Sequence, residues 1–390
     1  MGEILRPLGP LACVVGARPN YMKMAPLVRA FGARRSLPGA VLIHTGQHYD
    51  LAMNERLFAD LGMPAPDLNL EVGSGTHAVQ TAEVMRRFEP VVDELKPSCV
   101  VVVGDVNSTL AVSLVASKKG TPVVHVEAGL RSFDRGMPEE INRVLTDQIA
   151  DVLYTTERDA AANLAREGID ATRVRFVGNV MIDSLRAHLP RAVAPADALA
   201  HAGVDAGAYL QAAGFGVVTL HRPSNVDHPD ALGEALALLR DVAGRVPLIW
   251  PVHPRTRANI ERFGFASLLE GAPIALLPPQ GYLEMLGLLA GARVVLTDSG
   301  GIQEETTALA VPCLTMRENT ERPITVSQGT NTLVGRDRTR AAACMDEILQ
   351  NGGKRGRVPE LWDGDAAGRI AADLEQWLAR RQAALEPRRS

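Results

Sequence analysis

Three segments of the sequence place carboxylates next to cations, a combination that suits proton transfer. Asp105 lies in GDVNST and Glu127 in HVEAGLR, each directly after a short apolar run. Glu139 and Arg143 lie four residues apart in MPEEINR, so they would share one face of a helix. Crowded carboxylates push their pKa values apart, which lets one act as an acid and another as a base. Any single pair also suits a plain surface, but two carboxylates at strand ends favour a functional site.

Two histidines follow apolar runs in the second half of the chain. His221, with Arg222 beside it, comes after residues 216–220, and His253 comes after residues 247–251. A lone histidine is more often structural than catalytic, whereas two at strand ends favour a role in the same site. None of these side chains has the spacing of metal ligands, so we expect no metal.

A first anion-binding turn is indicated near the start of the chain. The segment GARPN follows the apolar residues 11–15 and leads into a helix. Gly16 permits a sharp turn, and the helix start offers backbone N–H groups and a positive dipole end to an anion. Arg18 and Lys23 add positive charge there. The alternative interpretation is a surface Arg and Lys that flank a loop and bind no anion. The segment is not a dinucleotide fingerprint, so a nicotinamide site is not supported.

A second anion-binding turn is indicated by TDSGGIQEE, which follows the apolar residues 294–296. Ser299, Gly300 and Gly301 would present a hydroxyl and backbone amides to a diphosphate at the start of a helix. Glu305 lies further along that helix, where its carboxylate could accept both hydroxyls of a ribose. An acidic residue there could instead only complement the helix dipole.

Short β-branched runs alternate with segments of helical spacing along almost the whole chain. This alternation predicts an α/β fold of parallel sheets with helices on both faces. The strands expected in the first half are residues 11–15, 41–44, 99–103, 123–126 and 152–154. Those expected in the second half are residues 216–220, 247–251, 274–276, 294–296 and 313–315. The expected helices include residues 24–34, 78–95, 108–118, 231–242 and 282–289.

The strand pattern restarts after an Ala-rich connecting segment, residues 186–214, which predicts two domains. We place the boundary near Ser184, giving an N-terminal domain of residues 1–184 and a C-terminal domain of residues 185–365. A last amphipathic helix is expected over residues 366–386. Two such domains facing each other would bring the carboxyl ends of both sheets to one cleft, where ligands of these sheets bind.

Composition narrows the class of protein. Hydrophobic residues make up 46% and charged residues 22%, which is ordinary for a globular protein. The net charge of −4 argues against nucleic acid or an anionic membrane as the main partner. The first ten residues lack the pattern of a signal peptide, so we expect a cytoplasmic protein. The four cysteines are widely separated and read as free thiols in a reducing compartment: Cys13, Cys99, Cys313 and Cys344.

Taken together, the motifs resemble those of the non-hydrolysing UDP-N-acetylglucosamine 2-epimerases over nearly the whole chain. The segments that carry the resemblance are GARPNYMKMAPL, TGQHYD, GDVNST, HVEAGLRS, MPEEINR, TDSGGIQEE and RENTERP. The resemblance implies two facing Rossmann-like domains, as in glycosyltransferases of the B type, with the final helix packing back on the first domain. It also implies a homodimer.

The chemistry implied by the resemblance is elimination of UDP from UDP-N-acetylglucosamine, followed by its re-addition to a bound 2-acetamidoglucal. The proton at C2 is not adjacent to a carbonyl, so simple deprotonation would be costly. Breaking the anomeric C–O bond develops oxocarbenium character and acidifies C2, after which a carboxylate can act as base. The departing diphosphate needs cations and dipoles. No cofactor is required.

Site residues follow from the motifs that match the family. The catalytic acids implied are Asp105, Glu127 and Glu139, with Arg143 and His221 as supporting polar groups. The positions that hold UDP include Arg18, Lys23, Ser299 and Glu305. Four further positions resemble those that bind a second, activating UDP-N-acetylglucosamine in some bacterial members, although they could equally only line the cleft: Gln47, His48, Arg222 and His253.

The sequence departs from the family's commonest pattern in three places. It reads GARPN where the family often has GTRPE, and GDVNST where a Thr-rich stretch is common. Residues 72–81 differ from the stretch that carries an allosteric Arg in activated members. Relatives of this kind also act on modified sugars such as diacetamido uronic acids. Other readings are a hydrolysing epimerase, a glycosyltransferase of the same fold and a non-catalytic nucleotide-sugar sensor. GARPN and MPEEINR favour the non-hydrolysing type over the first, and the presence of all three acidic residues disfavours the other two.

Overall fold

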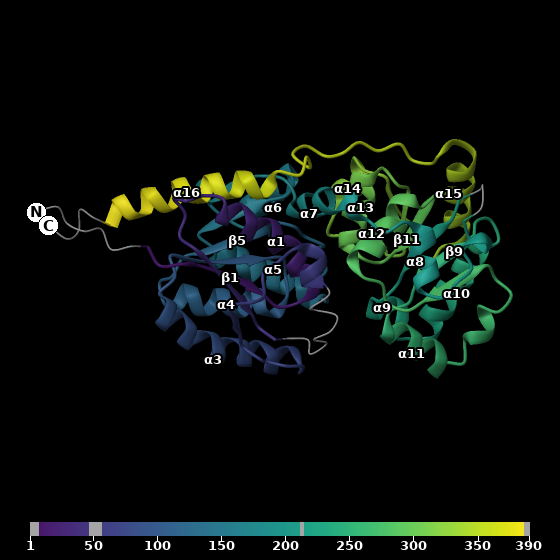
Figure 1. The fold of residues 1–390 in the computed structure, drawn as a ribbon, viewed down its shortest axis with the longest axis horizontal. Coiled ribbons are helices and arrows are strands. Elements are labelled where there is room, and N and C mark those ends of the chain that lie inside the picture. Colours follow the sequence, from purple (N-terminus) through teal and green to yellow (C-terminus); the bar gives the residue numbers. More distant parts are fainter. Residues whose placement is uncertain (1–7, 47–56, 211–213, 386–390) are drawn as a thin grey trace, which may run out of the picture. The chain divides into compact units, whose positions relative to one another are not determined.

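The computed structural model describes residues 8–46, 57–210 and 214–385 of the 390-residue chain. The chain divides into two compact units (Figure 1). The first unit comprises Met1–Ser184 and Glu360–Ser390, and the second comprises Leu185–Pro359. The chain therefore crosses to the second unit at Ser184 and returns to the first at Glu360, a few residues before its last helix.

The first unit is built on a parallel sheet, whose described strands lie in the order β3-β2-β1-β4-β5-β6-β7. Its central strands are almost continuously apolar because helices cover both faces of a parallel sheet. The seven described strands are β1 (Leu11–Val15), β2 (Ala40–His44), β3 (Leu68–Asn69), β4 (Cys99–Val103), β5 (Val123–Ala128), β6 (Val152–Thr155) and β7 (Val174–Phe176).

Helices pack on both faces of this sheet. Val100 and Val102 of β4 pack against Val84 and Phe88 of α3 and Val112 of α4. On the other side of the sheet α1 packs against β1 and β2, and α16 lies against α1 (Figure 1). The helices of this unit's N-terminal part whose bounds are described include α1 (Arg18–Gly32), α3 (His77–Leu95), α4 (Asn107–Lys118), α5 (Pro138–Ile149), α6 (Arg158–Arg166) and α7 (Val180–His188), which continues into the second unit.

The last helix, α16 (Ala366–Leu385), packs on the first unit. Asp183 caps its start, since its carboxylate accepts hydrogen bonds from the backbone N–H groups of Ala366 and Ala367 at 3.1 and 2.7 Å. Further along, Tyr154 of β6 donates a hydrogen bond of 2.9 Å to Asp373. The C-terminal segment is thus tied to the sheet by specific buried contacts.

The second unit has a parallel sheet of its own, whose described strands lie in the order β10-β9-β8-β11-β12-β13. Neighbouring residues of a strand face opposite sides. Val218 packs toward α10 and α15, whereas Val217 packs toward α8 and α12. The six described strands are β8 (Gly216–Thr219), β9 (Leu248–Pro251), β10 (Ile274–Leu277), β11 (Val294–Thr297), β12 (Cys313–Thr315) and β13 (Asn331–Leu333).

The described helices of the second unit alternate with these strands. They are α8 (Pro195–His201), α9 (Pro223–Val226), α10 (Pro229–Ala243), α11 (Pro254–Arg262), α12 (Tyr282–Gly291), α13 (Gly300–Leu309), α14 (Pro323–Ser327) and α15 (Arg338–Asn351). Short 3-10 helices cover Ala171–Arg173, Leu189–Arg191, Ala206–Ala208 and Ala266–Leu268.

The predicted α/β class is confirmed, and the strands expected from apolar runs are present. The prediction did not single out β3, β7 and β13, which lie at the edges of the two sheets. These strands have only two or three residues, and most of their side chains are partly exposed. An edge strand buries one side only, so it carries little of the apolar signal that reveals a central strand.

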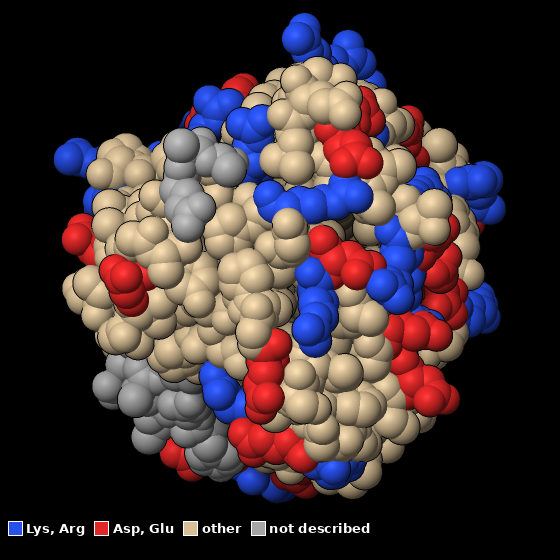
Figure 2. Space-filling view, turned by 90° about the vertical axis from the view of Figure 1, so that its right-hand side faces the viewer, with Lys and Arg blue, Asp and Glu red and all other residues tan. Residues whose placement is uncertain are grey.

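Charged residues of both signs occur together on the surface, as they do along the sequence. Figure 2 shows basic and acidic side chains interspersed over the face formed by the second unit. Ion pairs contribute to this pattern, for example Arg338 with Asp241 and Arg336 with Glu234, which join α15 and the turn before it to α10. Among the described helices, none is long and apolar enough to cross a membrane.

Candidate active site

Asp105 lies where the chain leaves β4 and turns into α4. The turn is made by Gly104, whose φ of +66° favours glycine. The Asp105 carboxylate accepts a hydrogen bond from Arg143 of α5, with 2.5 Å between Oδ2 and Nη2. Asn142 donates to the Asp105 backbone carbonyl at 2.9 Å. Residues of α5 therefore hold both the main chain and the side chain of Asp105.

Glu127 lies at the end of the neighbouring strand, β5. Its φ of +73° is a left-handed conformation that costs energy for a side chain with a Cβ, and such strain gathers at functional sites. Its carboxylate forms a buried ion pair with Lys23 of α1, with 2.6 Å between Oε2 and Nζ. A Cβ on Gly104 would lie 3.0 Å from the same Nζ. The ends of β4 and β5 and the start of α1 therefore meet at one buried point.

The turn before α1 is held by Asn20, a residue of the predicted anion-binding segment GARPN. In the structure the N–H groups of Gly16 and Ala17 donate to the Asn20 side chain, both at 3.1 Å. Asn20 in turn donates to the carbonyl of Val103 at 3.0 Å. Asn20 thus ties the turn to the end of β4, and the half-buried Arg18 begins the helix.

The acidic helix α5 contains Glu139, Glu140 and Arg143. Glu139 is half-buried, whereas Glu140 is buried and forms an ion pair with Arg143, with 2.8 Å between Oε2 and Nη1. Glu140 also accepts hydrogen bonds from the backbone N–H groups of Ser132 and Phe133, both at 2.9 Å. Sequence reasoning singled out Glu139 and missed Glu140, because letters alone do not tell which of two adjacent acids a helix turns inward.

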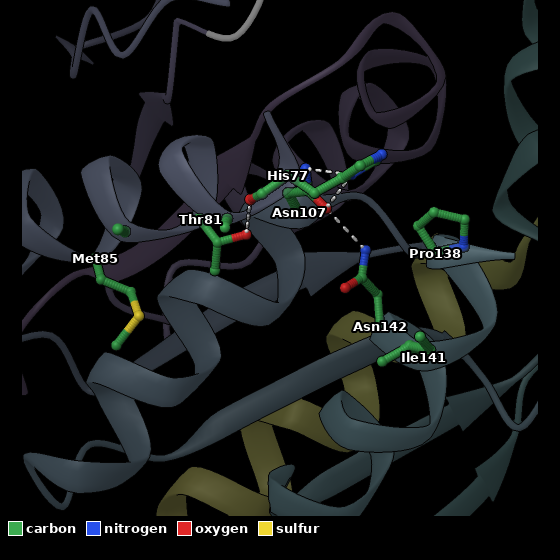
Figure 3. Close-up of a pocket in the computed structure, with 9 residues that line it drawn as sticks. His77, Thr81, Met85, Asn107, Pro138, Ile141 and Asn142 are labelled. Carbon is green, nitrogen blue, oxygen red and sulfur yellow. Dashed lines mark hydrogen bonds between the residues drawn. The ribbon is translucent and has the colours of Figure 1, made fainter. Parts of the chain in front are cut away.

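A pocket of about 380 Å³ opens beside this region, between α3, the start of α4 and α5 (Figure 3). Two of its polar residues are linked, since Asn142 donates to Asn107 at 3.3 Å, and Asn107 donates in turn to Gln80 of α3 at 2.8 Å. Asn142 is also the residue that holds the Asp105 carbonyl. Most of the lining is apolar: Ala78, Ala82, Met85, Pro138 and Ile141.

The second unit carries a separate polar centre around Asp298, at the end of β11. Asp298 is fully buried and accepts hydrogen bonds from the backbone N–H groups of His221 and Arg222. Its carboxylate also lies 3.2 Å from Nδ1 of His221, whose side chain is partly exposed. Burial alone would raise the pKa of Asp298, but the His221 imidazole, the Arg222 amide and Asn225 hold it below its usual range. Asp298 therefore fixes the orientation of the His221 ring.

The start of α13 has the form expected of a diphosphate cradle. Ser299 is the N-cap and Gly300 and Gly301 form the first turn. A Cβ on Gly300 would lie 2.6 Å from the Glu321 carboxylate, so any other residue there would have to displace that side chain. Glu321 is held in turn by Arg222, at 3.1 Å. A helix start with small residues leaves backbone N–H groups accessible to an anion.

Glu305 lies further along α13. It is buried, and the Tyr282 hydroxyl donates to its carboxylate at 3.3 Å. Burial raises the pKa of Glu305 to about 8, against the lowering effect of the Tyr282 hydrogen bond, and the nearby Glu304 adds to the rise. An uncharged Glu305 can both donate and accept a hydrogen bond, which suits contact with a pair of sugar hydroxyls.

Residues 34–375 match the family model described as UDP-N-acetylglucosamine 2-epimerase, a span well over half of the chain. The chain belongs to the UDP-N-acetylglucosamine 2-epimerase family. Members of this family are isomerases, so the protein is an enzyme of that class. The family resemblance recognised in the motifs is thereby confirmed.

Two relatives and one solved structure show how far this family match extends. Over 372 residues the chain is 40% identical to the UDP-N-acetylglucosamine 2-epimerase of Methanocaldococcus jannaschii, covering 93% of this chain and 98% of the relative. Over 368 residues it is 40% identical to the UDP-2,3-diacetamido-2,3-dideoxy-D-glucuronate 2-epimerase of Pseudomonas aeruginosa, with the same coverage. The crystal structure of the M. jannaschii enzyme in complex with UDP-GlcNAc and UDP superposes with a TM-score of 0.84, at 39% identity, covering 94% and 99% of the two chains.

The positions expected to bind a second nucleotide sugar are only partly described. Arg222 and His253 both lie in the second unit, and the His253 ring centroid is 5.9 Å from that of His221. His253 also caps α11, since its ring accepts a hydrogen bond from the Arg255 N–H. Gln47 and His48 lie outside the described residues. Within the described part of the chain, no group of three or more His, Cys, Asp or Glu is arranged to hold a metal ion.

Proposed function

We propose that this family member interconverts UDP-N-acetylglucosamine and UDP-N-acetylmannosamine without net hydrolysis. The observation that carries the proposal is the pair of carboxylates at the ends of adjacent strands. Asp105 follows β4 and Glu127 lies near the end of β5, and each is held by a cation, Arg143 for the first and Lys23 for the second. The reaction needs one group that removes a proton and one that returns it, and this edge of the sheet supplies two acids side by side.

The proposed reaction has two steps that mirror each other. In the first, a carboxylate takes the proton from C2 while the bond between C1 and the diphosphate oxygen breaks. The electron pair of the C–H bond forms the C1–C2 double bond of 2-acetamidoglucal, and the C–O pair leaves with UDP. In the second, an acid returns a proton to the opposite face of C2 and the phosphate oxygen attacks C1. Asp105, Glu127 and Glu139 are the proposed acids and bases.

The leaving diphosphate is proposed to bind at the start of α13, through Ser299, Gly300 and Gly301, with Glu305 on the ribose. His221, whose ring is oriented by Asp298, is proposed to donate a hydrogen bond to developing negative charge. In the first unit Arg18 and Lys23 are proposed to add positive charge. Because Lys23 already binds Glu127, an approaching diphosphate would draw the ammonium toward itself and leave the carboxylate freer to act as base.

A second candidate substrate has support from the relatives. The chain is as similar to the diacetamido-glucuronate epimerase of P. aeruginosa as to the N-acetylglucosamine epimerase of M. jannaschii. Both reactions invert C2, so the carboxylate pair serves either. The two sugars differ at C3 and C5, and the preference is read directly by comparing kcat/KM for the two UDP-sugars under one set of conditions.

The proposal is tested by incubating the protein with UDP-N-acetylglucosamine in deuterated water and following the mixture by NMR. We expect deuterium at C2 and a second UDP-sugar, with the nucleotide still attached. Free UDP and free sugar in equal amounts would show a hydrolysing enzyme instead. Absence of exchange with this sugar, but exchange with the diacetamido uronate, would assign the second substrate.

We also propose that the protein is a cytoplasmic homodimer. Two large apolar side chains, Ile141 and Leu145, are exposed one turn apart on α5, and Val79 is exposed on α3. A second copy of the chain covering this face would remove them from water. Light scattering on the purified protein should give twice the mass of the chain, and a monomer at all concentrations would contradict the proposal. Binding of a second, activating UDP-sugar near Arg222 and His253 stays a prediction.

A further inference from the structure

A second set of charges lies behind the two carboxylates, buried inside the first unit. His125, in the middle of β5, and Asp147, on α5, are both fully buried, and Arg131 is 3% exposed. Arg131 binds Asp147 at 2.7 Å and Glu167 at 2.6 Å. None of these four residues belongs to the acids and bases proposed above. Burying charged groups in a core costs free energy, which pairing offsets only in part, so their role needs an explanation.

The groups around Asp147 favour its ionised form. Its Oδ2 accepts from the Gly129 N–H at 3.0 Å and from Arg131, and its Oδ1 lies 2.7 Å from Nδ1 of His125. Burial alone would raise the pKa of Asp147, but His125 and Arg131 lower it below its usual range. An ionised carboxylate only accepts hydrogen bonds, so Nδ1 of His125 must be the donor.

The other ring nitrogen of His125 faces a second acceptor. Nε2 lies 2.8 Å from the backbone carbonyl of Gly104. A carbonyl oxygen has no proton to give, so Nε2 must donate as well. A neutral imidazole carries a proton on one nitrogen only, and a ring that donates from both is the imidazolium cation. With His125 and Arg131 positive and Asp147 and Glu167 negative, the cluster is balanced in charge.

The cluster holds the backbone at the ends of both carboxylate-bearing strands. The Gly104 carbonyl, held by His125, begins the peptide that leads to Asp105. The Gly129 N–H, held by Asp147, follows two residues after Glu127. Gly104, Glu127 and Gly129 all have left-handed φ angles, of +66°, +73° and +79°. Glycine adopts such angles freely, whereas a residue with a Cβ, here Glu127, is strained by them and keeps them only where surrounding contacts enforce them.

We propose that His125 is held as a doubly protonated imidazolium and acts as a positioning residue for the two carboxylates that end β4 and β5. The catalytic consequence of this proposal rests on the proposed function, whereas the protonation state of the His125 ring does not. A neutral His125 would leave either the Gly104 carbonyl or the Asp147 carboxylate facing a nitrogen lone pair in a dry core. The loss of either bond would release one of the two strand ends, and with it the alignment of Asp105 or Glu127.

The state of the ring is tested by NMR on the full-length protein carrying 15N-labelled histidine, without substrate. At about pH 8, where exposed histidines are neutral, we expect one histidine whose two ring nitrogens both carry a bonded proton. His125→Gln should remove that signal and so assign it, whereas His201→Gln, at an exposed position on α8, should leave it in place. A His125 ring with a single bonded proton would overturn the proposal.

The positioning role is tested by turnover of the same variants. A glutamine amide can donate to only one of the two acceptors at a time, so we expect kcat to fall by about 10²-fold, the cost of a misplacement of roughly 1 Å. KM should change less than about threefold, since His125 does not touch substrate, and His201→Gln should match the wild type. Unchanged kcat in His125→Gln would refute the role. If the wild type itself shows no epimerisation, the proposed function fails, while the NMR measurement still decides the state of the ring.

Discussion

Replacing Gly104 with alanine tests whether the junction of β4, β5 and α1 is the working centre of the first unit. An alanine at φ +66° would be strained by about 1–2 kcal/mol from its backbone alone. Its Cβ would also lie 3.0 Å from Lys23 Nζ, where ordinary contacts begin at 3.4 Å, so the ammonium must move by a few tenths of an ångström. Glu127 and Asn20 lie 3.9 and 3.6 Å from the same point and would shift with it.

The matched control is Gly120→Ala. Gly120 has nearly the same φ, +71°, but nothing lies within 4 Å of its added Cβ, and it is exposed after α4. Both variants should lose about 1–2 kcal/mol of stability, measured as the midpoint of denaturant unfolding. Only Gly104→Ala should lose turnover, by roughly 10- to 100-fold, because it alone displaces the Lys23–Glu127 pair. Equal epimerase activity in the two variants would refute our placing of the reacting groups.

Three further changes probe other parts of the account. Asp105→Asn should lower kcat by about 10²–10⁴-fold and leave the affinity for UDP, measured by calorimetry, within about threefold of the wild-type value. The surface change Asp93→Asn should alter neither quantity. Near-normal turnover in Asp105→Asn would remove Asp105 from the mechanism. Because burial raises the pKa of Glu305 from 4.5 to about 8, the folded protein keeps a proton that the unfolded chain loses. Its contribution to stability is therefore complete below about pH 4.5 and declines as the pH rises toward 8, and Glu305→Gln should abolish that decline in a series of unfolding midpoints. Asp183→Ala should lower the free energy of unfolding by about 1–2 kcal/mol, because it removes the cap of α16. Asp205→Ala should cost less, since Asp205 caps only a single 3-10 turn. Equal losses in the two variants would mean that the cap of α16 is no more important than that of the 3-10 turn.

The architecture was predictable because its central strands are buried on both sides. All residues of β4, CVVVV, are apolar, so the strand can be recognised from the sequence whichever side of the sheet each residue faces. The turn residues that follow it mark the carboxyl end of the strand, where ligands of such sheets bind. The sequence also predicts that Asp105 and Glu127 lie close together, since both come at the ends of apolar runs, and in the structure these runs are adjacent strands of one sheet. Edge strands such as β7 were not predicted because three partly exposed residues carry no clear period.

The partners of the site residues were less predictable than the residues themselves. Lys23 was expected to face an anion, yet its ammonium is bound to Glu127, a contact between residues 104 positions apart that no local pattern reveals. The Asn20 side chain accepts from the Gly16 N–H in the turn, and Glu140, which the sequence did not single out, joins Arg143 to the loop at Ser132. Each of these depends on which way a side chain turns, and that is decided by packing across elements distant in the sequence.

The central claim is that the bond between C1 and the diphosphate breaks and re-forms during epimerisation. It is tested most directly with UDP-N-acetylglucosamine carrying 18O in the bridge between C1 and the β-phosphorus. If UDP is released within the site, its terminal phosphate can rotate before it attacks C1 again. We therefore expect label to move from the bridge to the non-bridging oxygens of the β-phosphate, in both epimers and on the time scale of their interconversion. Epimerisation with all of the label still in the bridge would contradict the elimination mechanism.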